Sequence, residues 1–499
     1  MKKIVSILSF SLLVSAVNAE AIQTKEPNQI QNLSVVLASN DEINKSPSYA
    51  TSKPSYSSNA LSLSEAIVIL TQNNLEIKAA DFDVGAAKAD ETTASGNHWG
   101  KLDFVQDFAN SNDAGNVFGF KLTSREATFG DFGAEEFMGN TGACQGGDSS
   151  ACSDMYSQPP EDLNNPDSRN FFQSKVKYEI PLFTGFQISS YSDIMSAMTK
   201  MKKLEKQQVI NEKTYQLRKS FYDMALLSNS IENLTVILNN IYKLQDMTEN
   251  MIEVGYAKKV DLLEVKAKKG SVDRLLVQMH SNEALLYHYI SFLLNQKVTD
   301  IILPDKEVHV PTFSNDEILK NNLDIQRASA GLEVRKNMVD VSKSSFYPMV
   351  GAFGELATAD DSFLGDAADH QAYTVGARLT WNIFNGGIDN AKVEKSQIQH
   401  LKTQTQIQLA RAGIELQVQK IRTEIDSFDE EVTFLEKELD LANEIYANYE
   451  GRYKEKLTSM SNVIIKQSEQ IEKILQLQMT KNKRNERIFA LEKLANGEK

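Results

Sequence analysis

The most regular feature of the sequence is a heptad-like spacing of apolar residues in its last third. Apolar side chains recur at alternating steps of four and three residues between Ile421 and Tyr453, without a break. A similar seam lies 201 residues earlier, between Met224 and Ile252. This spacing is typical of long helices that pack side by side as in a coiled coil. Both segments are therefore predicted to form a long helical wall.

Two shorter segments alternate between apolar and polar residues with period two, which indicates β-strands. They run from Val176 to Leu182 and from Tyr373 to Ile383, and each precedes one of the long seams. Less regular partner strands are expected near 102–108, with 117–122 as a second possibility, and near 346–356. The apolar side chains expected on one face are Tyr178, Ile180, Leu182, Tyr373, Val375, Leu379 and Trp381.

Short motifs repeat at fixed distances, which predicts two structural halves. Pro181–Gly185 resembles Asn382–Gly386, and Leu293–Asn295 resembles Leu494–Asn496, both at an offset of 201. Asn74–Ile77 resembles Asn322–Ile325 at an offset of 248, so the first half holds about 47 additional residues before Phe183. Each half is predicted to read helix, strand, strand, long helix and returning helix.

The helix breakers mark the limits of these elements. Residues 186–254 contain neither proline nor glycine, and the whole chain has only 10 prolines. An uninterrupted helix of this length would measure about 100 Å, far beyond a globular diameter. The expected organisation is a signal peptide 1–19, a flexible segment 20–60, a first repeat 61–298 (hairpin about 100–183, helix 186–254), a linker 299–312, and a second repeat 313–499 (hairpin about 346–384, helix 387–453).

Four strands with one apolar and one polar face leave two interpretations open. A transmembrane barrel carries apolar residues outside and polar residues inside, and Trp381 and Tyr373 suit the membrane–water interfaces. Four strands cannot close a barrel alone, so this interpretation requires an oligomer in which each chain donates four strands. Alternatively, a small water-soluble sheet packs its apolar face on helices.

The N-terminal residues and the composition indicate the cell compartment. Lys2 and Lys3 precede a mostly apolar stretch and small residues at 17–19, which is the pattern of a secretory signal peptide. The two cysteines, Cys144 and Cys152, lie in the additional residues of the first half and are expected to form a disulfide in an exported protein. The formal charge of −14 disfavours a nucleic-acid partner. No metal-ligand spacing links the six histidines, so neither metal nor cofactor is expected.

Over roughly residues 61–499, the sequence resembles the TolC-like outer-membrane efflux factor family. The resemblance rests on the duplicated plan, the Leu-Phe-Thr-Gly junction at 182–185, the Ile-Phe-Asn-Gly-Gly junction at 383–387 and the tip motif at 255–263. It implies a mainly α fold with a small β part. Long antiparallel α-hairpins would form an α-barrel, and four transmembrane strands per chain would close as a trimeric twelve-stranded β-barrel.

The resemblance also places a gate at the two helix turns, 254–261 and 454–462. In the family, two acidic residues ring the aperture, and the matching positions here are Asn462 and Ile465. The acidic ring is therefore missing at its usual place. Asn462 is expected to line the constriction and Ile465 to supply an apolar collar.

Three further positions belong to this tip. Asp261 and Tyr453 match closure positions and are expected to hydrogen-bond between neighbouring helices, unless both are ordinary surface or seam residues. The family's tip glycine is present as Gly255, whereas Lys456 takes its place in the second half. The two turns are therefore predicted to be unequal.

The function implied is a passive duct in the outer membrane that extends into the periplasm. It would be a homotrimer that exports small molecules, or secretes proteins as in type I secretion. Its partners would be a periplasmic adaptor, an inner-membrane pump or ABC exporter, and outer-membrane lipid. The alternative is a soluble periplasmic coiled-coil adaptor or scaffold. An enzyme is disfavoured because no acid–base or nucleophile constellation is present.

Overall fold

The computed structural model of the chain describes residues 60–304, 308–363, 365 and 368–496. All of them belong to one unit, Tyr56–Lys499. The predicted signal peptide and all but the last residue of the predicted flexible segment 20–60 lie outside the described residues.

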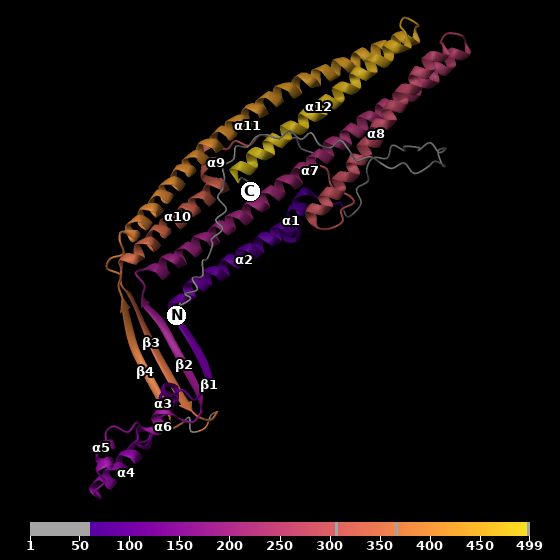
Figure 1. Ribbon diagram of the computed structural model, residues 1–499. Helices are drawn as coiled ribbons and strands as arrows, with labels where there is room; N and C mark the ends of the chain where they lie inside the picture. Colours follow the sequence, from indigo (N-terminus) through magenta and orange to yellow (C-terminus); the bar gives the residue numbers. More distant parts are fainter. Residues whose placement is uncertain (1–59, 305–307, 364, 366–367, 497–499) are drawn as a thin grey trace, which may run out of the picture. The chain divides into compact units, whose positions relative to one another are not determined.

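Two pairs of long helices are the largest elements of the fold (Figure 1). Helices α7 (Gln187–Glu253) and α11 (Ile388–Lys454) have 67 residues each. The returning helices α8 (Lys259–Leu294) and α12 (Met460–Ala495) have 36 residues each. Helix α7 packs along α8, α11 packs along α12, and α12 also contacts α7. Each 67-residue helix is about 100 Å long, and α7 coincides with the run 186–254 that lacks proline and glycine.

A pair of shorter helices begins each half. These are α1 (Leu63–Asn73) and α2 (Leu75–Gly96) in the first half, and α9 (Asn315–Asn321) and α10 (Leu323–Lys343) in the second. Helices α2 and α10 both pack against α7, and α10 also packs against α11. The short helices therefore complete the helical wall beside the strand-proximal part of the long ones.

The repeated asparagine motif has a structural role in both halves. Asn74 is buried; its side chain accepts hydrogen bonds from two backbone N–H groups that begin α2 and donates one to the Leu293 carbonyl at 2.8 Å. Asn322 does the same for α10 and donates to the Leu494 carbonyl at 3.1 Å. Each asparagine therefore caps a helix and ties it to the end of the returning helix, which explains why these distant motifs recur together.

The four strands form one antiparallel sheet in the order β1-β2-β3-β4. Their bounds are β1 (Lys101–Ser111), β2 (Arg169–Phe183), β3 (Met349–Asp360) and β4 (Gln371–Thr380). The hairpin of each half contributes two strands, and the halves join where β2 pairs with β3. Strands β1 and β4 are the two edges. Short 3₁₀ turns lie at Asn97–Trp99, Gly130–Phe132 and Ser344–Phe346.

The additional residues of the first half form a helical insertion between β1 and β2. It contains α3 (Ala114–Thr123), α4 (Ala134–Gln145), α5 (Ser149–Asp154) and α6 (Glu161–Asn164). The possible strand at 117–122 is wrong, because the Asp113 side chain caps a helix there by accepting from Asn116 N–H. Cys144 and Cys152 form a disulfide that joins α4 to α5.

Buried apolar clusters hold the helices together at equivalent places in the two halves. Leu70, Phe221 and Leu293 belong to one cluster, in which α1, α7 and α8 meet. Ile318 and Leu491 belong to the corresponding cluster of α9, α11 and α12. A third cluster follows the outer part of the long helices as far as Tyr453 and Met460. The heptad seams of the sequence are therefore largely packing positions.

Asp223 gives this helical packing a dependence on pH. It is half-buried on α7, and this burial raises the pKa of its carboxyl to about 6, with the charge of Glu486 adding to the rise and that of Lys219 opposing it. An unfolded aspartate titrates near 3.9. Between these two pH values the folded chain holds a proton that the unfolded chain has lost, so stability falls as pH rises from about 4 to about 6.

Asp223→Asn is therefore expected to raise the free energy of unfolding by about 1–2 kcal/mol at pH 7, and by much less at pH 4. The apparent melting temperature, followed by circular dichroism at both pH values, measures the effect. The exposed Asp246 on the same helix supplies the control Asp246→Asn, for which no gain is expected. An equal gain in melting temperature from both variants would contradict the conclusion that the buried Asp223 carboxylate destabilises the fold at pH 7.

Candidate functional site: the sheet and the helical tip

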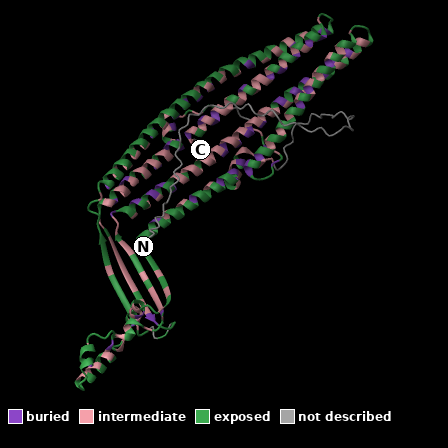
Figure 2. Cartoon of the chain, viewed as in Figure 1, coloured by how far each residue is buried: buried purple, intermediate pink, exposed green. Residues whose placement is uncertain are grey.

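One face of the sheet is apolar over most of its length. The pairing register aligns Phe104, Val176, Leu356 and Tyr373 in one row across the four strands. In the protomer these side chains are exposed, Tyr373 by 79% and Phe104 by 68%, and Figure 2 shows strands of exposed and intermediate residues. The helices do not cover this face, which disfavours the interpretation of a sheet packed on its own helices.

The sequence-predicted apolar residues lie along these strands. Tyr178, Leu182, Tyr373, Val375, Leu379 and Trp381 are all exposed, whereas Ile180 is half-buried in a row with Ala352 and Ala377. Leu102, Phe104 and Leu356 extend the surface across β1 and β3, where the sequence alternates less cleanly. Only the pairing register with β2 shows that these three residues belong to the apolar face.

The opposite face of the sheet carries charges. Lys177 lies in register with Asp103 on one side and Glu355 on the other. Ion pairs join Lys175 to Asp107 at 3.0 Å and Lys177 to Glu179 at 2.6 Å. An apolar face and a charged face on the same strands match the two sides of a transmembrane barrel wall, which contacts lipid outside and water inside.

Aromatic residues lie at both ends of the apolar face. At the helical end, Trp381 donates its indole N–H to the Phe346 carbonyl at 3.2 Å, and the Trp99 carbonyl accepts from the Tyr178 hydroxyl at 2.7 Å. At the other end, Phe108, Phe172 and Phe363 form a cluster with ring centroids 5.4–6.1 Å apart. Aromatic girdles at both interfaces are typical of outer-membrane barrels.

The two helix turns at the tip have the same backbone conformation, which corrects the expectation of unequal turns. Gly255 has φ +78° and Lys456 has φ +65°. The following residues, Tyr256 and Leu457, donate to the carbonyls of Met251 and Arg452 at 2.7 and 2.8 Å. A side chain in this left-handed region costs about 1–2 kcal/mol. The Lys456 ammonium lies 3.1 Å from the Tyr256 ring centroid, so a cation–π contact offsets part of this cost and links the two turns.

Further contacts hold the tips of the two hairpins together. Ser461 on α12 donates to the Glu264 carboxylate on α8 at 2.7 Å, and Lys268 donates to Ser468 at 2.7 Å. Within the second hairpin, the buried Gln467 side chain donates to the Tyr446 hydroxyl at 3.4 Å. No pattern in the sequence points to the contacts between the hairpins, because they join side chains about 200 residues apart.

The structure does not join Asp261 to Tyr453 by a hydrogen bond. The Asp261 carboxylate accepts from the Lys258 backbone N–H at 2.9 Å and so caps its own helix. The Tyr453 hydroxyl is buried and has no hydrogen bond of standard geometry among the described residues. Burial raises the pKa of Tyr453; the neighbouring Thr248 hydroxyl lowers it, and the charge of Asp261 raises it further.

Asn462 and Ile465 lie in the first turns of α12. Asn462 is exposed; its backbone N–H is capped by the Ser459 side chain, and its amide donates to the Thr458 hydroxyl at 3.1 Å. The Ile465 side chain is 53% exposed in the protomer. Neither residue packs into the core cluster at the tip, so both remain available to a surface outside this chain.

Residues 315–495 match the outer membrane efflux protein family. No curated protein sequence matches the chain. Several solved structures are similar in fold. The Campylobacter jejuni CmeC outer membrane channel is 13% identical, with a TM-score of 0.69 over 93% of this chain and 94% of that chain. The outer-membrane channel OprN is 14% identical, with a TM-score of 0.70 over 91% and 98%.

A third similar structure is CusC, described in a study of folding and transmembrane channel formation. It is 12% identical, with a TM-score of 0.71 over 87% of this chain and 92% of that chain. The predicted fold class is therefore confirmed, and the family resemblance is confirmed over residues 315–495. Within the described residues, no helix is long and apolar enough to cross a membrane.

Proposed function

We propose that this chain is an outer-membrane efflux protein of the TolC-like family and works as a passive homotrimeric duct. It lies in the outer membrane and extends into the periplasm. The homotrimer is supported by the sheet, which has an apolar face, a charged face and two edge strands without a partner strand among the described residues. Unpaired edges are not tolerated in lipid, so β1 and β4 require partners from other copies of the chain.

The long helices extend the duct away from the sheet. Efflux channels of this family generally work with periplasmic adaptors and inner-membrane pumps. In our proposal the turns at Gly255 and Lys456 meet the adaptor, because they form the end of the molecule farthest from the sheet along the helices (Figure 1). The pump or ABC exporter supplies the energy and selects small molecules or proteins as substrates. The chain itself carries out no catalysis.

Fractionation combined with crosslinking tests this function. A heat-sensitive trimer that fractionates with the outer membrane is expected. The rival function, a soluble periplasmic coiled-coil scaffold, predicts a monomer or dimer in the periplasmic fraction, and that result would overturn the duct. A soluble scaffold would also leave the exposed apolar face of the sheet in contact with water.

The tip is proposed as the gate. Asn462 and Ile465 line its aperture in place of the acidic ring, and Tyr453 with Asp261 belongs to its closure network. The buried Tyr453 hydroxyl supports this role, because an unbonded buried hydroxyl is unfavourable and gains a partner when neighbouring helices of the assembly approach.

Tyr453→Phe is expected to shorten the closed time of single channels while leaving the melting temperature nearly unchanged. The closed state loses a hydrogen bond to a neighbouring helix, worth about 0.5–1.5 kcal/mol, whereas the packing of the ring within the protomer is kept. Planar-bilayer recording measures the closed time. Tyr449→Phe, four residues earlier on α11, is the control. Unchanged closed times in Tyr453→Phe would remove this residue from the network.

A further inference from the structure

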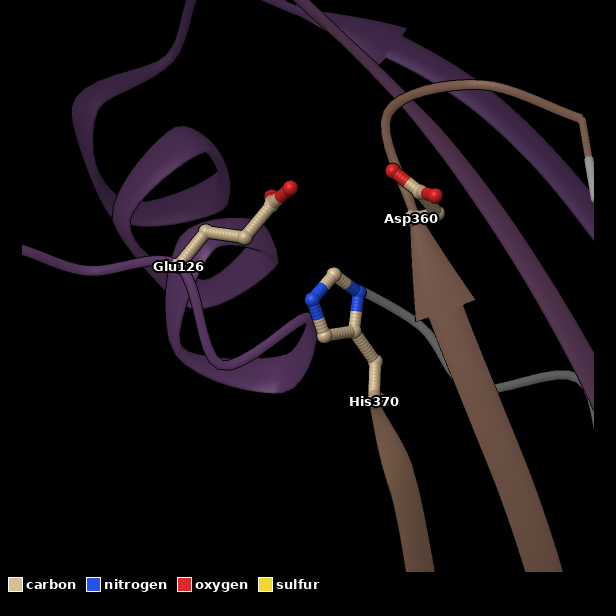
Figure 3. Close-up of side chains that lie close together, drawn as sticks. All are labelled: Glu126, Asp360 and His370. Atoms are coloured by element: carbon tan, nitrogen blue, oxygen red, sulfur yellow. The ribbon is translucent and has the colours of Figure 1, made fainter. Parts of the chain in front are cut away.

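Three chemically suitable ligands converge where the helical insertion meets the sheet. Glu126 follows α3, Asp360 ends β3, and His370 directly precedes β4. One ligand atom from each residue lies within 4.8 Å of the other two. Figure 3 shows the imidazole ring of His370 between the two carboxylates. This cluster lies at the end of the sheet opposite the helices and takes no part in the duct or the tip gate.

The Glu126 carboxylate is held so that one oxygen stays available. Both of its contacts use Oε2, which accepts from the Ser124 hydroxyl at 2.7 Å and pairs with the Arg169 guanidinium. Oε1 has no contact of this kind among the described residues. Partners of this kind fix the orientation of a carboxylate that ligates a metal ion.

His370 is oriented in a similar way. Its Nδ1 lies 3.2 Å from the Ala359 carbonyl, which can only accept a hydrogen bond. In this hydrogen bond the proton therefore lies on Nδ1, so Nε2 is the ring nitrogen that can bind a cation. A histidine that donates its second ring N–H to a backbone carbonyl is the usual state of a metal-bound imidazole.

The third ligand and the surrounding charges also favour a cation. Asp360 is only 6% exposed, and its Oδ1 accepts from the Asp361 backbone N–H at 2.6 Å. Arg169 also lies 3.6 Å from the Asp361 carboxylate. A cation bound here would offset part of the cost of burying the Asp360 carboxylate.

We propose that Glu126, Asp360 and His370 bind a divalent transition-metal ion, for which Zn²⁺ is the probe. One imidazole and two carboxylates suit Zn²⁺ better than Ca²⁺, which prefers oxygen ligands alone. Ligands of one tetrahedral Zn²⁺ ion lie about 3.4 Å apart at bond lengths of about 2.1 Å, so side-chain movements of about 1–1.5 Å close the site. The bound ion fastens the base of the insertion to the β3–β4 end of the sheet.

Equilibrium dialysis of the full-length mature protein in detergent against Zn²⁺ tests the proposal. One Zn²⁺ per chain is expected, with His370→Ala weakening the affinity at least tenfold. His280→Ala is the matched control, because the exposed His280 lies 3.1 Å from Glu283 on α8 as another histidine–carboxylate pair, and this variant should bind as the unaltered chain does. The trimer band of each variant verifies folding.

A second measurement separates binding from adventitious association. Zn²⁺ should raise the melting temperature of the unaltered chain and of His280→Ala, but not that of His370→Ala or Glu126→Gln, because a ligand stabilises only the state that binds it. Absence of stoichiometric Zn²⁺, or equal affinity in His370→Ala, would overturn the site and leave the cluster as an ion-pair network. Neither result bears on the duct, because the site makes no use of the export function.

Discussion

Val375→Lys should sharply reduce the amount of assembled trimer in the outer membrane. Val375 is 78% exposed in the protomer and lies on the apolar face of β4, in register with Gly354, Tyr178 and Leu102 across the sheet. A lysine on the lipid-facing side of an outer-membrane strand costs about 2–4 kcal/mol near the middle of the bilayer. The cost arises three times in a trimer, so a strong effect is expected.

The neighbouring Thr374 provides the matched control. It is exposed too, but its side chain points to the charged face, where it lies in register with Glu355. Thr374→Lys places the new ammonium in a polar environment and should leave the trimer nearly intact. The measurement is the ratio of trimer to monomer on unheated gels of outer-membrane fractions. Equal loss in both variants would show that this face does not contact lipid.

Much of the fold could be predicted because duplicated packing leaves duplicated sequence. An asparagine recurs at positions 74 and 322 because in both halves it caps a helix and hydrogen-bonds to the end of the returning helix. Asn295 and Asn496, both with φ +50°, recur because each ends a returning helix in the left-handed conformation. Local patterns of this kind are visible in a single sequence, and they fix the order and the length of the elements.

The remainder depends on contacts that the sequence does not encode locally. Glu126, Asp360 and His370 come from three separate segments, so their spacing along the chain carries no ligand pattern. The expectation of unequal tip turns failed because a lysine can adopt the conformation of the glycine it replaces. Lys456 does so beside the Tyr256 ring, a contact 200 residues away along the chain.

Gly185→Ala should disrupt the junction between the sheet and the helices. Gly185 has φ +62°, and a Cβ atom there would lie 2.6 Å from the Ser344 carbonyl oxygen and 2.9 Å from the Tyr347 Cβ atom. The left-handed backbone alone costs about 1–2 kcal/mol for an alanine, and the forced displacement of the Ser344 backbone adds about 1–3 kcal/mol. Phe183, Phe186 and Tyr347 pack edge to face around the same turn, so a displaced backbone also disturbs these rings.

The repeat supplies the comparison that isolates this close approach. Gly386 occupies the equivalent position in the second half, with φ +69°, and a Cβ atom added there would have no neighbouring atom within 4 Å, so Gly386→Ala carries only the backbone cost. The apparent melting temperature of the trimer should therefore fall clearly further for Gly185→Ala than for Gly386→Ala. If both variants lose the same stability, the close contact with Ser344 contributes nothing to the free energy of unfolding. The two junctions would then be equivalent in stability, as they are in sequence.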